Sequence, residues 1–184
     1  MKKVFVFLAD GFEETEAIAT IDVLRRGGVE TVSVSVSETT SVTGAHQVTV
    51  IADRLFSETD FSDGAMLVLP GGMPGASHLN EHAGLKALLQ DYADKDKKIA
   101  AICAAPLVLG GLNLLQGKRA TVYPGYESLL KGAIVETSPV VKDANIITGR
   151  GPGAALPFGL ALVETLQGKE KADKVANDLL PAAI

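Results

Sequence analysis

Short apolar runs alternate along the chain with stretches whose hydrophobic residues recur at helical spacing. The apolar runs predict buried strands, and the helical spacing predicts helices with one buried face. The runs that predict strands are 3–9, 31–37, 65–69, 98–102, 119–122 and 145–148. The stretches that predict helices are 13–26, 81–93, 126–131, 154–166 and 169–180. Strands alternating with helices favour right-handed crossovers, so we expect an α/β protein with a mostly parallel sheet in a three-layer α/β/α sandwich.

Residues 41–53 depart from this alternation. Two β-branched runs there flank Gly44 and Ala45, which is typical of a small hairpin. No repeat, linker or low-complexity tract divides the 184 residues, a length that suits one core. We therefore expect a single domain over residues 1–184.

Loops at the carboxyl ends of parallel strands form the sites of such sheets. One of these loops begins at Cys103, the chain's one cysteine, where an apolar run turns into a helix-compatible segment. A nucleophile at a strand-to-helix elbow lies beside backbone N–H groups that favour a thiolate over a thiol. The alternative is that Cys103 is a small buried hydrophobe. The loops that meet at this edge are 10–16, 70–75, 103–106 and 149–153.

The composition and net charge of the chain argue against several classes of protein. The chain is 47% hydrophobic and 21% charged, and its net charge of −5 argues against a dedicated nucleic-acid site. The apolar start at 3–9 is too short for a membrane span or a signal peptide, so we expect a cytoplasmic protein that does not engage a membrane. A lone cysteine excludes an internal disulfide and a cysteine-rich zinc site.

Three acids begin the first predicted helix: Glu13, Glu14 and Glu16. Acids at this position complement the helix dipole. One of them could instead reach Cys103, where a protonated carboxyl would donate a hydrogen bond to the sulfur anion. Periodicity alone does not select which glutamate does so.

Some of the glycines and histidines are further candidates for residues of a functional site. Gly71 and Gly72 suit a simple turn, or an oxyanion hole together with the N–H of Ala104. The glycines at 149–153 lack the lysine and spacing of a phosphate loop. His78 and His82 belong to an H-x-x-E-H pattern of inverted zinc peptidases, but the segment also suits helix capping, and we expect no metal.

A cysteine hydrolase needs a histidine that exchanges protons with the thiol. The chain's three histidines, His46, His78 and His82, all precede Cys103. A cysteine–histidine dyad is therefore hard to assemble unless His46 or a partner subunit completes it.

Several stretches, taken together and in order, resemble the DJ branch of the ThiJ/PfpI superfamily over nearly the whole chain. They are 11–17 (GFEETEA), 20–28 (TIDVLRRGG), 69–72 (LPGG), 100–106 (AAICAAP), 150–153 (RGPG) and 158–160 (FGL). The resemblance implies a flavodoxin-like fold, usually a homodimer, with a reactive cysteine on the elbow. It selects Glu16 as the protonated glutamate that hydrogen-bonds Cys103.

The resemblance also assigns the surroundings of these two residues. It gives Gly71, Gly72 and Ala104 to the anion-binding backbone. Residues lining the site or the dimer contact beside it would be Arg26, His46, Arg150 and Pro152. His46 stands where relatives often carry arginine.

Tyr123 departs from one member of the branch, which has a histidine near the cysteine. Bacterial relatives also place an aromatic residue here. A tyrosine can donate a hydrogen bond in the substrate site, but its ordinary pKa near 10 makes it a poor base at neutral pH. Histidine-dependent proton transfer is therefore not expected.

The function that the resemblance implies is a cofactor-independent glyoxalase or deglycase. Cys103 and Glu16 would act on small aldehydes, reactive dicarbonyls or glycated protein, with a role in oxidative stress. The alternative is a redox sensor or chaperone that works through oxidation of the same cysteine. An intracellular cysteine protease is disfavoured, because members that act as proteases carry a histidine directly after the cysteine and this chain has Ala104.

Overall fold

Six strands of the central sheet run parallel, and one edge strand runs antiparallel to its neighbour. The computed structural model describes residues 2–180. In spatial order the seven strands are β10 (Val140–Asp143), β11 (Ile146–Gly149), β7 (Lys98–Ile102), β6 (Gly64–Leu69), β1 (Lys3–Leu8), β2 (Glu30–Ser35) and β5 (Arg54–Leu55). The strand order 2-1-3-4-5 of a flavodoxin-like sheet lies within it, as β2, β1, β6, β7 and β11. The predicted fold class is confirmed.

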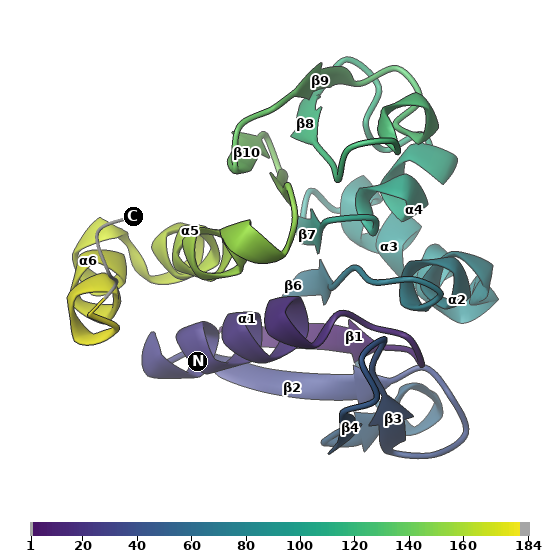
Figure 1. Ribbon diagram of the computed structural model, residues 1–184, viewed down its shortest axis with the longest axis horizontal. Helices are drawn as coiled ribbons and strands as arrows, with labels where there is room; N and C mark the ends of the chain where they lie inside the picture. The colour runs from purple at the N-terminus through teal and green to yellow at the C-terminus, as the bar shows by residue number, and fades with distance from the viewer. Residues whose placement is uncertain (1, 181–184) are drawn as a thin grey trace.

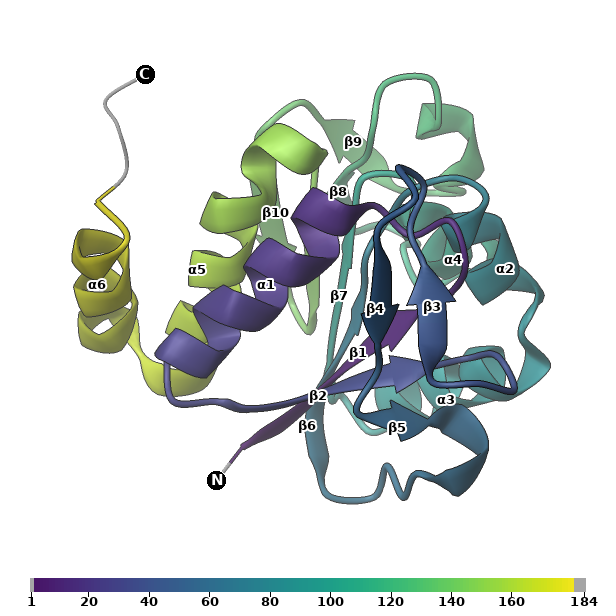
Figure 2. The same cartoon turned by 60° about the horizontal axis from the view of Figure 1, so that its bottom comes forward.

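Helices cover both faces of this sheet (Figures 1 and 2). On one face lie α1 (Glu14–Arg26), α5 (Ala155–Gln167) and α6 (Lys169–Asp178). On the other lie α2 (Gly75–Glu81), α3 (Ala83–Asp94) and α4 (Pro106–Gly111). Within residues 2–180, no helix is long and apolar enough to cross a membrane.

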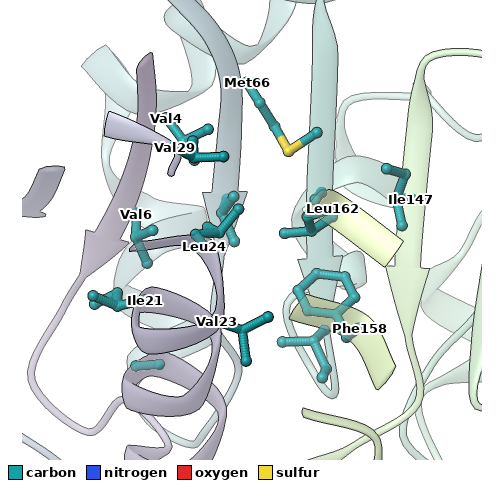
Figure 3. Close-up of a cluster of buried hydrophobic side chains, with 14 of the residues drawn as sticks. Val4, Val6, Ile21, Val23, Leu24, Val29, Met66, Ile147, Phe158 and Leu162 are labelled. Atoms are coloured by element: carbon teal, nitrogen blue, oxygen red, sulfur yellow. The ribbon is translucent and has the colours of Figure 1, made fainter. Parts of the chain in front are cut away.

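The alternation of side chains along β1 divides the core into two layers. Val4 and Val6 point to the α1–α5 face, where they belong to one cluster with Leu24 and Phe158 (Figure 3). Phe5, on the same strand, points to the α3 face. Because side chains of a strand alternate with a period of two, a continuous apolar run is what a strand buried on both faces requires.

The hairpin predicted in 41–53 is present as β3 (Ser41–Thr43) and β4 (Thr49–Ile51), which pair antiparallel outside the main sheet. The strand expected at 119–122 is β8 (Arg119–Thr121), but it pairs with β9 (Ile134–Glu136) in a separate two-stranded sheet.

Three other local expectations need correction. The segment expected to be a helix at 126–131 forms only a 3-10 turn at Glu127–Leu129. The glycine- and proline-rich loop after β6 is shorter than expected, because α2 already begins at Gly75. Strand β10 was not predicted, because Val140 and Val141 are its only aliphatic residues. The single domain expected over 1–184 includes residue 1 and residues 181–184, which lie outside the described residues.

Candidate active site

Cys103 lies in a strained turn directly after β7. Its φ of 63° is in the left-handed region, which costs a residue with a side chain about 1–2 kcal/mol. Hydrogen bonds on both sides hold it there: its N–H donates to the carbonyl of Gly149 and its carbonyl accepts from the N–H of Tyr123, each over 2.9 Å. Helix α4 begins three residues later, at Pro106, so the turn is looser than the immediate strand-to-helix junction expected. The thiol is buried, with 7% of the residue exposed.

The three acids at the start of α1 have three different partners. Glu13 is the N-cap, and its carboxylate accepts from the N–H of Glu16 over 2.7 Å. Glu14 binds the β3–β4 hairpin, accepting from the N–H of His46 over 2.7 Å. Glu16 is completely buried, and its Oε2 accepts from the N–H of Gly71 over 2.8 Å. Of the three, Glu16 is the one that shares its surroundings with Cys103.

Gly71 lies against both Glu16 and Cys103. A Cβ built on Gly71 would lie 2.6 Å from the Cβ of Cys103 and 2.8 Å from Oε2 of Glu16. Both side chains therefore lie against the same point of the backbone, which only a glycine leaves open. The N–H of Gly71 is already bound to Glu16, so its expected place in an oxyanion hole is corrected to one of holding the carboxyl group.

Burial raises the pKa values of both Glu16 and Cys103. Burial raises the pKa of Glu16 to about 7, against the lowering effects of the Cys103 thiol and the Gly71 N–H. Burial, followed by the charge of Glu16, raises the pKa of Cys103 to about 12. The N–H groups of Gly72 and Ala104 act in the opposite direction and lower the thiol pKa. The backbone donors expected to favour a thiolate are thus present, but burial and the charge of an ionised Glu16 outweigh them.

Oε1 of Glu16 is buried without a hydrogen-bond partner of standard geometry among residues 2–180. An unpaired buried carboxylate oxygen is costly, whereas a protonated carboxyl at this position could donate to a nearby acceptor. The position therefore suits a carboxyl group that carries a proton.

Tyr123, Arg150 and Pro152 converge on a pocket of about 340 Å³ beside the elbow. Tyr123 joins the pocket to the site, because its N–H binds Cys103 and its ring lies against Gly151. Gly151 and Gly153, in the loop 149–153 expected at the site, also line it, whereas the other pocket residues were not identified from the sequence: Pro124, Thr137, Pro139 and Ala154. Of these, Thr137 and Pro139 lie between β9 and β10, where the chain shows no motif.

Two residues expected to line the site, Arg26 and His46, pair with carboxylates other than that of Glu16. Arg26 ends α1, ten residues from Glu16, and its Nε pairs with Asp22 over 2.7 Å. His46 is exposed, and its Nδ1 pairs with Glu14 over 2.9 Å. The ligand atoms of Glu13, Glu14 and His46 lie within 4.8 Å of one another, but hydrogen bonds within the protein already use Glu13 and Glu14.

The H-x-x-E-H segment makes structural bonds. Nδ1 of His78 is 2.8 Å from the carbonyl of Asp10. Nδ1 of His82 accepts from the N–H of Leu85 over 2.9 Å and thereby caps α3. The segment does cap a helix, but the cap is His82 rather than Asn80 or Glu81, and neither histidine bonds to Cys103.

Comparison with known proteins identifies the family. A model described as the DJ-1/PfpI family matches residues 2–165. Protein DJ-1 homolog A of Arabidopsis thaliana is 41% identical over 182 residues, which are 97% of this chain but 46% of that protein. The chain thus spans less than half of that relative. Protein dj-1beta of Drosophila melanogaster is 38% identical, with 98% of each chain covered.

Solved structures show the same likeness. Oxidized DJ-1 of Toxoplasma gondii superposes with a TM-score of 0.95 at 40% identity, covering 100% of both chains. A C103A mutant of a DJ-1 superfamily protein from Salmonella typhimurium gives 0.94 at 32% identity, again with full coverage. The elbow cysteine, the buried glutamate beside it and these similarities over the whole fold agree: the chain belongs to the DJ-1/PfpI family.

Proposed function

We propose that this protein is a cofactor-independent thiol enzyme of the glyoxalase and deglycase class, with Cys103 as nucleophile and Glu16 as proton carrier. The observation that carries the proposal is the buried carboxyl of Glu16, held by the Gly71 N–H against the elbow cysteine. A carboxyl whose pKa is raised to about 7 can both give and take a proton at neutral pH.

The reactive form of the pair is the one with the proton on Glu16 and the charge on sulfur. When Glu16 is ionised, its charge helps to raise the pKa of Cys103 to about 12 and disfavours the thiolate. Once Glu16 is protonated, this repulsion is gone; burial still raises the thiol pKa, and the N–H groups of Gly72 and Ala104 act against it. Near pH 7 both states of Glu16 are populated, so the state in which its charge no longer opposes the thiolate is present under ordinary conditions.

The reaction needs no external oxidant. The thiolate adds to the aldehyde carbon of methylglyoxal, and the resulting oxyanion takes the proton from Glu16, which gives a hemithioacetal and the Glu16 carboxylate. The Glu16 carboxylate then removes the proton from that carbon and returns a proton to the neighbouring one, so the former aldehyde carbon is oxidised to a thioester while the ketone is reduced to an alcohol. Water hydrolyses the thioester to lactate and frees the thiol. The N–H groups of Gly72 and Ala104 are the donors for the oxyanion.

We also propose that the protein is a homodimer in the cytoplasm, with reactive dicarbonyls or glycated protein as substrates and a role in oxidative stress. Ile18 of α1 and Ile51 of β4 support the dimer, because they line one groove and are 45% and 71% exposed. Arg26 and His46 would then act at the subunit contact.

The test is lactate production from methylglyoxal by purified protein. We expect Cys103→Ser to abolish it and Glu16→Gln to lower it strongly, because Gln cannot move a proton. Tyr123→Phe is the comparison variant, since it keeps the backbone bond to Cys103 and removes only the phenol. Lactate production that survives in Cys103→Ser would overturn the proposal.

A redox role for the same cysteine is the second candidate. Its support is the donor pair of Gly72 and Ala104, which could stabilise a sulfinate as well as a thiolate. Intact mass after mild peroxide treatment tests it. A gain of two oxygen atoms that disappears in Cys103→Ser is expected, and an unmodified chain would remove this candidate.

A further inference from the structure

The pocket beside Tyr123 is lined mainly by uncharged residues and contains one positive charge. Prolines at 124, 139 and 152 line it together with the half-exposed ring of Tyr123. Its lining includes one ionisable group besides Tyr123, the guanidinium of Arg150. An apolar pocket with a single cation suits a small organic ligand with one anionic group.

Arg150 is held in place but has no charged partner. Its backbone N–H donates to the carbonyl of Pro139 over 2.9 Å, and its Nη1 donates to the carbonyl of Thr137. In the described part of the chain, Arg25, Arg26 and Arg119 pair with carboxylates, whereas Arg54 and Arg150 have no carboxylate within 4.0 Å. The remaining N–H groups of a fixed guanidinium are suited to a planar carboxylate.

Backbone contacts connect this cation to the thiol. Arg150 directly follows Gly149, whose carbonyl accepts from the N–H of Cys103. Across the pocket, the N–H of Tyr123 donates to the carbonyl of Cys103, and the Tyr123 ring lies against Gly151. A ligand attached to the sulfur could therefore extend past Tyr123 into the pocket.

We propose that this pocket recognises a carboxylate on the substrate, and that the preferred substrates are 2-oxoaldehydes with a carboxylate on their side chain. The proposal rests on the proposed function for the reaction, but the recognition step can be measured without turnover. Arg150 binds the carboxylate, the prolines and Tyr123 contact the carbon chain, and the aldehyde carbon lies at Cys103. A 2-oxoaldehyde without the carboxylate leaves Arg150 unpaired and reacts more slowly.

Alkylation of Cys103 tests the recognition, because the chain has no other cysteine. Iodoacetate and iodoacetamide differ mainly in one negative charge, so the ratio of their rate constants reports an attracting cation near the sulfur. We expect Arg150→Gln to lower this ratio by about fivefold and Arg150→Lys to retain most of it, because a charged donor, which lysine keeps, makes a hydrogen bond to a carboxylate roughly twice as strong.

Arg54→Gln is the matched control. Arg54 is an exposed arginine whose guanidinium donates to a carbonyl, and it lies on β5 at the other end of the sheet. The control removes the same charge and should leave the ratio unchanged. An unchanged ratio in Arg150→Gln, or an equal fall in Arg54→Gln, would overturn the proposal.

Wild-type protein provides a second measurement that needs neither a variant nor a reactive thiol. In NMR titrations, pentanoate should shift the Arg150 Nε signal and the amides of Gly151 and Gly153, whereas pentanamide, which has the same chain but no carboxylate, should not. Equal shifts with both ligands, or none with either, would contradict carboxylate recognition. If lactate production fails while these shifts occur, the proposed reaction is wrong and the binding site stands.

Discussion

The N–H of Gly71 binds the carboxyl of Glu16 over 2.8 Å, although 55 residues separate them in the chain. The bond joins the loop after β6 to the first turn of α1, directly beside Cys103. It fixes the position of a completely buried carboxyl group, and in the proposed reaction it makes the loop part of the proton chemistry.

Gly71→Ala should damage this arrangement. The new Cβ would lie 2.6 Å from the Cβ of Cys103 and 2.8 Å from Oε2 of Glu16, so both side chains must move. We expect unfolding in urea to show a loss of about 1–3 kcal/mol, as overpacking of a dense core does. Gly153→Ala is the control, because a Cβ there meets nothing within 4 Å. Equal stability of the two variants would contradict the close packing described here.

Glu16 should make stability depend on pH. Its pKa of about 7 in the folded protein lies above the ordinary 4.5, so the native state binds the proton more tightly than the unfolded chain. The contribution is complete below the unfolded pKa and is lost as the pH rises through 7. We expect wild type to lose about 2 kcal/mol relative to Glu16→Gln between about pH 5.5 and 8.5. Parallel stability profiles would show that Glu16 titrates normally.

Much of the fold follows from the sequence because the pattern of apolar residues is strong where elements are buried. The run 98–102 is apolar on both faces of its strand, and α1 combines helical spacing with the cap at Glu13 and two arginines at its end. Strands β9 and β10 could not be predicted in the same way. They are short and partly exposed, so tertiary contacts rather than local pattern define them.

The site was predictable to the extent that its residues belong to recognisable loops. Cys103 could be located because an apolar run ends there, but the choice of Glu16 among the three acids depended on resemblance. The partners of Glu13 and Glu14 are set by the first turn of α1 and by the hairpin, whose relative placement no local pattern specifies. Thr137 was missed for the same reason, since it reaches the pocket only through the path of the chain between β9 and β10.

The strained elbow predicts an unusual order of stability. Glycine adopts a φ of 63° without strain, whereas alanine does not. Both Cys103→Gly and Cys103→Ala remove the sulfur, so their difference isolates the backbone. We expect the glycine variant to be more stable than the alanine variant by about 1 kcal/mol in urea unfolding. The opposite order would mean that residue 103 relaxes out of the left-handed region when its side chain is removed.

Glu14 should hold the hairpin through backbone bonds more than through its ion pair with His46. Its Oε1 accepts from the N–H groups of His46 and Val48, over 2.7 and 3.4 Å, whereas the His46 ring itself is exposed. In amide hydrogen exchange, Glu14→Ala should speed exchange at residues 46 and 48 by about tenfold, because local opening no longer breaks these bonds. His46→Ala keeps both acceptor interactions and should change exchange at Val48 much less, since an exposed ion pair contributes little. If the two variants speed amide exchange at Val48 equally, the side-chain pair rather than the backbone bonds holds the hairpin against α1.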